Sequence, residues 1–422
     1  MKDKAKLYRL TTVDLSLDKL IAGQLKFLSD YIDVTGVASD TGLLQGVAKR
    51  EGVKVINVPM QREISLKDDV KSLWTLYKLF RKDKPDLLHC NTPKGSLLAL
   101  IAAKLAGVPN RIYTVTGLRY QGAKGLFRFI LKSMERISCF CATKVIPEGQ
   151  GVLHTLHSDH ITNKPLEVLH NGNINGIDTM HFSRDAVEGN IREELGFADD
   201  DFVFVFVGRI THDKGMNELA NAMRKLNGEK TLRRAKLLIV GTFEEGDPID
   251  KDAEEYFKTS PDVVLAGWQD DVRPFLKAAD ALVFPSYREG FPNAPMQAGA
   301  MDLPSIVTNI NGCNEIIKDG LNGTIIFAPL TQNAKREDPN DASIMRGPNH
   351  KNIEDVAGAD KRLDGPAKMQ EALYTAMKWY LEHPEDVKRM AGNARKMIQE
   401  RYEQKDVWNA LLNMYRQLTV RV

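Results

Sequence analysis

Residues 202–215 read Phe-Val-Phe-Val-Phe-Val-Gly-Arg-Ile-Thr-His-Asp-Lys-Gly, six apolar residues followed by a basic turn that begins and ends with glycine. An unbroken apolar run of this length predicts a strand covered on both faces, as in a parallel sheet. The sequence after the turn has helical period. In open α/β sheets, ligands bind beyond the carboxyl ends of the strands, where helix N-termini present unpaired N–H groups. The turn is therefore predicted to lie at a ligand-binding site.

The rest of the chain repeats this alternation of a strand-like run and a helix-length segment in two series. The first series has runs at 7–13, 34–38, 53–58, 87–90, 112–116 and 143–146. The second has runs at 202–207, 236–240, 263–265, 281–284 and 304–308. Two such series predict the fold class α/β, with two doubly wound, Rossmann-like domains.

Local composition predicts where these domains begin and end. The Asn- and Gly-rich segment 171–176 is the expected hinge, which places an N-terminal domain over 1–180 and a C-terminal domain over 181–404. A final helix at about 405–422 can pack back onto the N-terminal domain. Residues 331–366 are polar and lack periodicity, which predicts a mobile insertion in the C-terminal domain.

The overall composition limits the class of protein. The chain has 422 residues, of which 43% are hydrophobic and 27% are charged, as in soluble globular proteins. No apolar run approaches the roughly 18 residues of a membrane-spanning helix, and the N-terminus has no apolar signal region. We therefore expect a soluble, cytoplasmic protein with reduced cysteines.

The net charge of +2 conceals two parts of opposite sign. Residues 1–180 carry 26 basic and 17 acidic side chains, and within them residues 71–140 carry 13 basic and 3 acidic ones. This asymmetry predicts that the N-terminal domain meets an anionic partner, such as a phosphorylated molecule, a lipid surface or nucleic acid. Nucleic acid is disfavoured because no aromatic stacking pattern accompanies the basic region.

The basic turn after residue 207 suits a diphosphate. Gly208 allows close approach to the backbone, Arg209 can donate to two phosphate oxygens, and Lys214 acts as a compact point charge. The alternative is a basic turn that only faces solvent. Because neither a Gly-x-Gly-x-x-Gly nor a Walker sequence is present, neither a nicotinamide cofactor nor ATP is expected.

A second turn with ligand chemistry follows the apolar run that ends at Phe284. It contains Glu289 in a Gly- and Pro-rich sequence, where a carboxylate can accept hydrogen bonds from vicinal hydroxyls. Gln297 follows in a predicted helix and can both donate and accept. The alternative is that Glu289 only favours the start of this helix. Together with Arg209 and Lys214, Glu289 forms a candidate site.

These motifs in combination resemble the C-terminal half of the retaining glycosyltransferases of family 4, which have the GT-B fold. The resemblance rests on Gly208-Arg209 and Lys214-Gly215, followed by Pro285-Ser286 and Glu289-Gly290-Phe291-Pro292. Segments 171–182 and 312–323 are also similar to that family. Residues 114–120 and 287–293 are similar to the branch that builds capsular and O-antigen polysaccharides.

The resemblance implies two domains that face each other across a cleft, with the acceptor on the N-terminal domain and the donor on the C-terminal one. It implies transfer of a hexose or N-acetylhexosamine from a nucleotide-diphosphate sugar, most commonly a UDP-sugar, with retained configuration. It also implies that neither a metal nor another cofactor is needed, since Arg209 and Lys214 stabilise the leaving diphosphate. The acidic triplet at 199–201 is accordingly expected to be solvated.

Carried over residue by residue, the resemblance assigns Arg209, Lys214 and Glu289 to catalysis, with Glu289 on the hydroxyls of the donor sugar. The implied donor-binding residues are Gly208, Phe291, Pro292, Asn293, Gln297 and Thr116. Gln297 stands where the family usually has a Glu that contacts the ribose, and Thr116 where many relatives have a His.

Acceptor contacts are predicted at strand ends of the N-terminal domain, at Ser16, Lys94 and Arg119. Ser16 lies in the first strand–helix loop, Lys94 at the start of a helix, and Arg119 beyond another strand. Given the basic charge of this region, we expect a polyprenyl-diphosphate-linked saccharide, or another saccharide, as the acceptor. It would be presented at the cytoplasmic face of a membrane.

Basic residues recur at every fourth position among apolar ones in the segment 122–137, at Lys124, Arg128, Lys132 and Arg136. This pattern predicts a basic amphipathic helix that can rest on an anionic membrane. The enzyme would then be peripheral at the inner face of that membrane. The alternative is an ordinary surface helix whose apolar face lies in the core.

Other functions fit parts of the same pattern. A nucleotide-sugar 2-epimerase on a similar scaffold would release product from the donor alone, and a catalytically silent sugar-nucleotide-binding subunit would bind the donor without transfer. A glycosidase needs two facing carboxylates, and only Glu289 is well placed for that chemistry.

Overall fold

The computed structural model describes residues 4–61, 65–229, 234–327 and 365–419, which form two compact units. The first unit comprises Met1–Gly176 together with Gln404–Val422, and the second comprises Ile177–Glu403. The insertion predicted at 331–366 lies outside the described residues, apart from its last two positions, which begin helix α14 (Gly365–Glu382).

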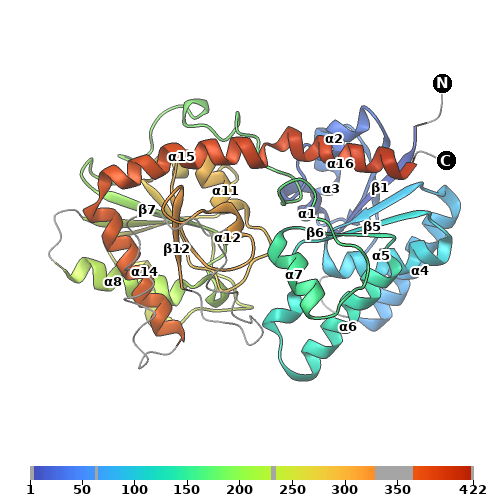
Figure 1. The fold of residues 1–422 in the computed structure, drawn as a ribbon, viewed down its shortest axis with the longest axis horizontal. Helices are drawn as coiled ribbons and strands as arrows, with labels where there is room; N and C mark the ends of the chain where they lie inside the picture. The colour runs from blue at the N-terminus through green and yellow to red at the C-terminus, as the bar shows by residue number, and fades with distance from the viewer. Residues whose placement is uncertain (1–3, 62–64, 230–233, 328–364, 420–422) are drawn as a thin grey trace. The chain divides into compact units, whose positions relative to one another are not determined.

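The first unit is built on a parallel sheet with the strand order β3-β2-β1-β4-β5-β6 (Figure 1). Its strands are β1 (Lys6–Val13), β2 (Asp33–Ser39), β3 (Lys54–Asn57), β4 (Leu87–Cys90), β5 (Asn110–Val115) and β6 (Lys144–Pro147). The strand order reverses between β1 and β4, which is the arrangement of a doubly wound, Rossmann-like sheet.

Helices cover both faces of this sheet. One layer consists of α4 (Leu66–Asp83), α5 (Pro93–Ala106), α6 (Gly125–Cys141) and α7 (Gln150–Ser158). The other consists of α1 (Asp14–Lys19), α2 (Gln24–Ser29), α3 (Leu44–Glu51) and α16 (Gln404–Thr419). In β4, Leu87 belongs to one buried cluster and Leu88 to the other, because successive side chains of a strand point to opposite faces.

The last helix, α16, belongs to the first unit although it lies at the far end of the chain. Leu411 and Tyr415 are buried in the cluster that also contains side chains of α1, α2 and α3. Trp408 Nε1 donates a hydrogen bond to Asn175 Oδ1 at 2.7 Å. Gly23 has a φ of +78°, and a Cβ there would lie 2.8 Å from the Trp408 ring. Close packing and a partly buried hydrogen bond therefore both hold α16 in this unit.

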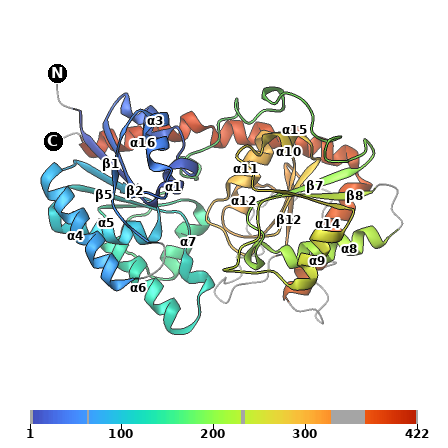
Figure 2. The same ribbon diagram turned by 180° about the vertical axis from the view of Figure 1, so that it is seen from behind.

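The second unit repeats the topology, with the strand order β12-β11-β10-β7-β8-β9 and all pairs parallel (Figure 2). Its strands are β7 (Phe202–Val207), β8 (Ala235–Val240), β9 (Val263–Gly267), β10 (Ala281–Phe284), β11 (Ser305–Thr308) and β12 (Gly323–Ile326). Its helices besides α14 include α8 (Met216–Gly228), α9 (Lys251–Thr259), α11 (Asn293–Ala300) and α15 (Pro384–Tyr402). The predicted fold class is confirmed, and among the strands of the described residues only β12, four residues long, was missing from the prediction.

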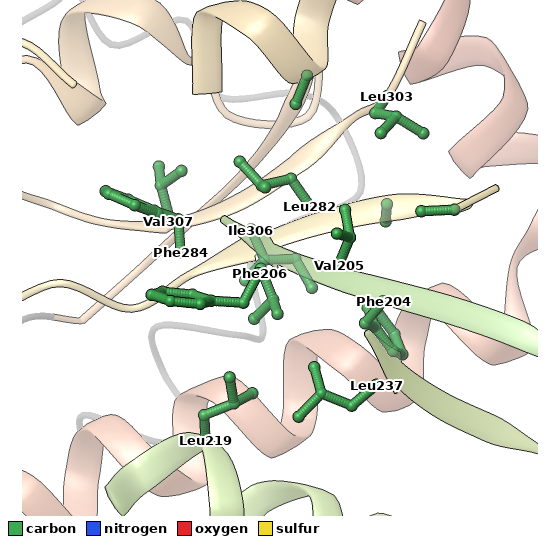
Figure 3. Packing of buried hydrophobic residues seen from close by; sticks show 14 of the residues in the cluster. Phe204, Val205, Phe206, Leu219, Leu237, Leu282, Phe284, Leu303, Ile306 and Val307 are labelled. Atoms are coloured by element: carbon green, nitrogen blue, oxygen red, sulfur yellow. The ribbon is translucent and has the colours of Figure 1, made fainter. Parts of the chain in front are cut away.

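Strand β7 lies at the centre of the second core. Phe204, Val205 and Phe206 have no exposed surface, and Figure 3 shows them beside Leu237 of β8 and Leu282 of β10. Burying side chains of this size stabilises the fold by about 1.5–3 kcal/mol each. The strand is covered on both faces, as its apolar sequence predicts.

A buried carboxylate lies on the inner side of α6. Glu135 is only 6% exposed, and burial raises its pKa from 4.5 to about 7, although the neighbouring hydroxyl of Tyr113 offsets part of that rise. The folded protein therefore keeps a proton on Glu135 that the unfolded chain loses near pH 4.5. Where the unfolded state binds fewer protons, stability falls as the pH rises.

We predict that Glu135→Gln removes this pH dependence. Wild-type stability should fall between about pH 4.5 and 7 and then level off, whereas the variant, which carries no titrating group there, should be the more stable protein at pH 8. The difference should be a few kcal/mol at most, since one pKa unit corresponds to about 1.4 kcal/mol. Chemical unfolding at pH 5 and pH 8 measures it. The exposed Glu167→Gln is the control, and an equal effect of Glu135→Gln at both pH values would contradict the assignment.

Candidate active site

Two turns at the carboxyl ends of the neighbouring strands β7 and β10 form the candidate site. Arg209 lies two residues after the end of β7, Lys214 ends the short 3-10 turn His212–Lys214 that leads into α8, and Glu289 lies in the turn after β10. Lys214 Nζ forms an ion pair with Glu289 Oε1, and both side chains are 14% exposed. The structure thus brings together a cation and a carboxylate that are 75 positions apart in the sequence.

Backbone packing holds the two turns against each other. Gly215 has a φ of +71°, and a Cβ at this position would lie 2.1 Å from the carbonyl oxygen of Pro285. The amide of Tyr287 donates to the carbonyl oxygen of Asp213 at 2.9 Å, and Arg288 forms an ion pair with the Asp213 carboxylate. Only glycine allows this approach without strain. The ion pair between Lys214 and Glu289 is therefore preorganised by its own loops.

Two further side chains support the same turns. Tyr287 donates its hydroxyl hydrogen to Glu218 Oε1 at 2.6 Å, and its ring stacks on His212 with centroids 5.6 Å apart. Glu218 lies in α8 and is 5% exposed. Sequence reasoning did not single out Glu218 or His212, because their partners lie in a different turn of the chain.

The predicted donor-binding residues after Glu289 present mainly backbone. The Phe291 side chain is 6% exposed and packs against Tyr402, with the two ring centroids 5.5 Å apart. Because this ring is covered, only the backbone of Phe291 can line a ligand. Pro292 and Asn293 lie at the start of α11, and Gln297 lies within it and is half-buried. Gly312, with a φ of +73°, packs against the backbone of Gly290 and Phe291.

Arg209 has a partner that the sequence did not indicate. Its side chain is 59% exposed and forms an ion pair with Glu244, which follows β8 and is 42% exposed. The turns after β7 and β8 run side by side, because the amide of Gly208 donates to the carbonyl oxygen of Val240 and the amide of Ile210 donates to that of Thr242. Two adjacent glutamates after a strand are the only sequence signal that could have drawn attention to this position.

In the first unit, the predicted residues lie at strand ends but have different surroundings. Thr116 Oγ1 donates to the carbonyl oxygen of Asn91 at 2.8 Å. Lys94 is 7% exposed and forms an ion pair with Asp69 of α4 at 2.7 Å. Ser16 lies inside α1 instead of the expected loop, and Arg119 is exposed in a 3-10 turn. Lys94 is thus a buried, paired cation, whereas Arg119 can reach solvent.

The described part of the chain contains no helix long and apolar enough to cross a membrane. Within the same residues, no group of three or more His, Cys, Asp and Glu side chains is arranged to hold a metal ion. The four cysteines, Cys90, Cys139, Cys141 and Cys313, are buried and unpaired.

Comparison with known families finds two matching domain models. Residues 201–336 match the model described as glycosyl transferases group 1, and residues 19–148 match the model described as glycosyl transferase 4-like. The first match contains the turns after β7 and β10, and the second contains the predicted acceptor residues Lys94 and Arg119.

Two curated relatives and one solved structure resemble most of the chain. The capsular polysaccharide biosynthesis glycosyltransferase CapM of Staphylococcus aureus is 35% identical over 76% of this chain and 83% of its own length. The UDP-Gal:alpha-D-GlcNAc-diphosphoundecaprenol alpha-1,3-galactosyltransferase of Escherichia coli is 30% identical over 71% of this chain and 77% of its own. The crystal structure of Anabaena HepE with UDP and glucose superposes with a TM-score of 0.72 at 15% identity, over 98% of this chain and 100% of that one.

We predict that Gly215→Ala disrupts the packing between the turns after β7 and β10. A methyl group there is strained by the positive φ and overlaps the Pro285 carbonyl, so stability should fall by about 2 kcal/mol or more. Chemical unfolding measures this loss. Gly246→Ala is the matched control, because nothing lies within 4 Å of a Cβ at that position and its effect should stay within about 0.5 kcal/mol. A Gly215→Ala protein as stable as wild type would contradict the packing described.

Proposed function

This chain belongs to the group 1 glycosyltransferases, and from that premise we propose that it moves a hexose or N-acetylhexosamine from a nucleotide-diphosphate sugar to a lipid-linked saccharide. Its relatives CapM and the Escherichia coli galactosyltransferase act in capsule synthesis and on a diphosphoundecaprenol-linked sugar, as their names state. The proposed donor is a UDP-sugar, and the proposed setting is surface polysaccharide synthesis.

The observation that carries the proposal is the largely buried pair of Lys214 and Glu289 in the turns after two adjacent strands. A carboxylate held in this way can accept hydrogen bonds from sugar hydroxyls, while the adjacent ammonium meets the phosphate on the same sugar. Arg209, at the start of the same turn as Lys214, supplies the second positive charge. A single site can then hold both the sugar and the diphosphate of the donor.

The proposed mechanism rests on electrostatic stabilisation. When the bond between the anomeric carbon and the phosphate oxygen breaks, both electrons stay on the diphosphate and positive charge develops on the sugar. Arg209 and Lys214 stabilise the departing diphosphate, as fixed charges do most effectively when they are preorganised. The acceptor hydroxyl attacks from the same face, and the leaving phosphate takes its proton. The configuration is then retained without a nucleophile from the protein.

Binding roles follow for the remaining predicted residues. Gly208 and the backbone of Phe291, Pro292 and Asn293 would line the diphosphate and the sugar. Gln297 would hydrogen-bond a ribose hydroxyl without adding charge, and Thr116 would offer a hydroxyl to the donor sugar from the first unit. On the acceptor side, exposed Arg119 is the best placed cation for an anionic group, with Ser16 in α1 and Lys94 at the start of α5 as the other proposed contacts.

Peripheral contact with an anionic membrane is part of the proposal, because α6 exposes a band of apolar side chains. Leu126, Phe129 and Phe140 are 75%, 64% and 70% exposed, and Ile130 and Ile137 lie on the same side of the helix. Leu131 and Glu135 cover the inner side instead. The helix therefore does not bury all of its apolar residues in the core, as an ordinary surface helix would. Exposed apolar patches of this kind mark interaction surfaces.

Helix α4 lies in the same layer of helices as α6 (Figure 1), and its exposed side chains form a second apolar stripe. Leu66, Val70 and Trp74, spaced by four residues, are 82%, 68% and 54% exposed. Lys94, at the start of α5, pairs with Asp69 in the first turns of α4, so this stripe lies at the sheet edge that carries the proposed acceptor residues. Exposed apolar residues beside that edge suit an acceptor whose lipid stays in a bilayer.

Two experiments separate this proposal from its alternatives. A thermal-shift screen of nucleotide sugars identifies the donor, and transfer is then measured with a polyprenyl-diphosphate-linked saccharide. Product from the donor alone would indicate a 2-epimerase, and binding without transfer or hydrolysis would indicate a catalytically silent subunit.

We predict that Arg209→Ala and Lys214→Ala each lower turnover by about a hundredfold to a thousandfold, which is the usual cost of removing one group that stabilises developing charge. The circular dichroism spectrum should be unchanged, because both residues lie at strand ends outside the core. Lys251→Ala, an exposed cation at the start of α9, should keep wild-type turnover. Near-normal turnover of either site variant would overturn the assignment.

We predict that replacing both Phe129 and Phe140 by Ser weakens binding to phosphatidylglycerol vesicles tenfold or more. Burying each ring in the bilayer would contribute about 1.5–3 kcal/mol to the binding free energy, and 1.4 kcal/mol corresponds to a factor of ten in affinity. Co-sedimentation measures the binding, and Met180→Ser, a 78% exposed residue of the second unit, is the control. Transfer to a water-soluble acceptor should be unaffected. Equal vesicle binding by the double variant and wild type would exclude α6 as the contact.

A further inference from the structure

Glu244 lies over the cationic turn although it is not one of the residues assigned to the donor. It pairs with Arg209, and both side chains are accessible to solvent. We propose that Glu244 is an internal counter-ion that occupies Arg209 until the diphosphate of the donor displaces it, so that this glutamate limits the affinity for nucleotide diphosphates. The inference rests on the proposed function of Arg209 and Lys214.

The loop that carries Glu244 is anchored on both sides of it. Ile210 donates its amide hydrogen to the carbonyl oxygen of Thr242 at 2.8 Å, and His212 donates to that of Asp247 at 3.1 Å. The Asp213 amide also donates to the Asp247 carboxylate at 2.9 Å. The segment between these anchors therefore runs along the turn that begins at Arg209 and ends at Lys214.

The backbone under Glu244 leaves little room for the loop to move as a whole. Gly241 has a φ of +153°, and a Cβ there would lie 1.8 Å from the carbonyl oxygen of Gly208. Ile210 and Phe243, two residues further along the two turns, form an isolated parallel β-bridge. The glutamate side chain, in contrast, has three rotatable bonds and is 42% exposed. Releasing Arg209 thus requires only a rotamer change of Glu244, not a rearrangement of the turns.

The release of Arg209 changes the net charge that a diphosphate meets at the site. Arg209 and Lys214 carry two positive charges, and Glu244 and Glu289 carry two negative ones. Glu289 is held by the largely buried Lys214, whereas exposed ion pairs such as that of Arg209 with Glu244 are weak and easily broken. A diphosphate that approaches this neutral set must displace Glu244 to obtain net attraction. Removing the charge of Glu244 should therefore strengthen its binding.

The test is calorimetric titration of UDP into the full-length protein at low ionic strength. Glu244→Gln keeps the shape of the side chain and removes its charge, so UDP should bind about threefold to tenfold more tightly than to wild type. Glu245→Gln is the matched control, because it makes the same change of charge at an exposed neighbour in the same loop. Its affinity should stay within twofold of wild type.

The double variant Arg209→Ala/Glu244→Gln shows whether Glu244 acts through Arg209. Its affinity for UDP should equal that of Arg209→Ala alone, because the counter-ion no longer has a partner to occupy. Unchanged or weaker binding by Glu244→Gln, or an equal gain from Glu245→Gln, would overturn the inference while Arg209→Ala still weakens binding. If Arg209→Ala binds UDP as wild type does, the proposed diphosphate site fails as well.

Discussion

The candidate site depends on one close contact, the approach of Gly215 to the carbonyl oxygen of Pro285. No residue with a Cβ fits there, since that atom would lie 2.1 Å from the oxygen. The contact places the end of the turn after β7 directly on the turn after β10, so Lys214 meets Glu289 without any movement of either loop. A charged pair fixed by backbone packing needs little reorganisation when a ligand arrives, which is the condition under which fixed charges are most effective.

The fold could be predicted from the sequence because the inner strands of its sheets are buried on both faces. Phe202–Val207 is a continuous apolar run, and burial on both faces of a parallel sheet requires such a run. Strand β12 escaped prediction because its four residues begin with glycine and include a threonine, so neither its length nor its hydrophobicity stands out. Short edge strands are specified by the neighbour they pair with, here β11, more than by their own residues.

The candidate site could be predicted only in part, because a sequence shows which residues are present but not which partners they have. Arg209, Lys214 and Glu289 were identified by their positions at strand ends. The partners of Arg209 and Lys94 were not, since Glu244 lies in the turn after the next strand and Asp69 in a preceding helix. Each acidic partner changes the chemistry that its cation, Arg209 or Lys94, can offer. Lys94 becomes a buried structural cation, whereas Arg209 stays accessible but neutralised. Charge patterns therefore indicate where a site lies better than they indicate its net charge.

The two units share one strand order but differ in the chemistry at their carboxyl edges. In the second unit, the turns after β7 and β10 carry charged side chains locked together by glycine contacts and ion pairs. In the first unit, the corresponding edge carries threonine hydroxyls that bond to each other and to the backbone, as Thr12 and Thr92 do, together with the paired Lys94 and the exposed Arg119. The doubly wound sheet accounts only for where ligands bind. The difference between an edge with interlocked charged turns and a hydroxyl-lined edge comes from a few loop residues, so one topology can present two different surface chemistries.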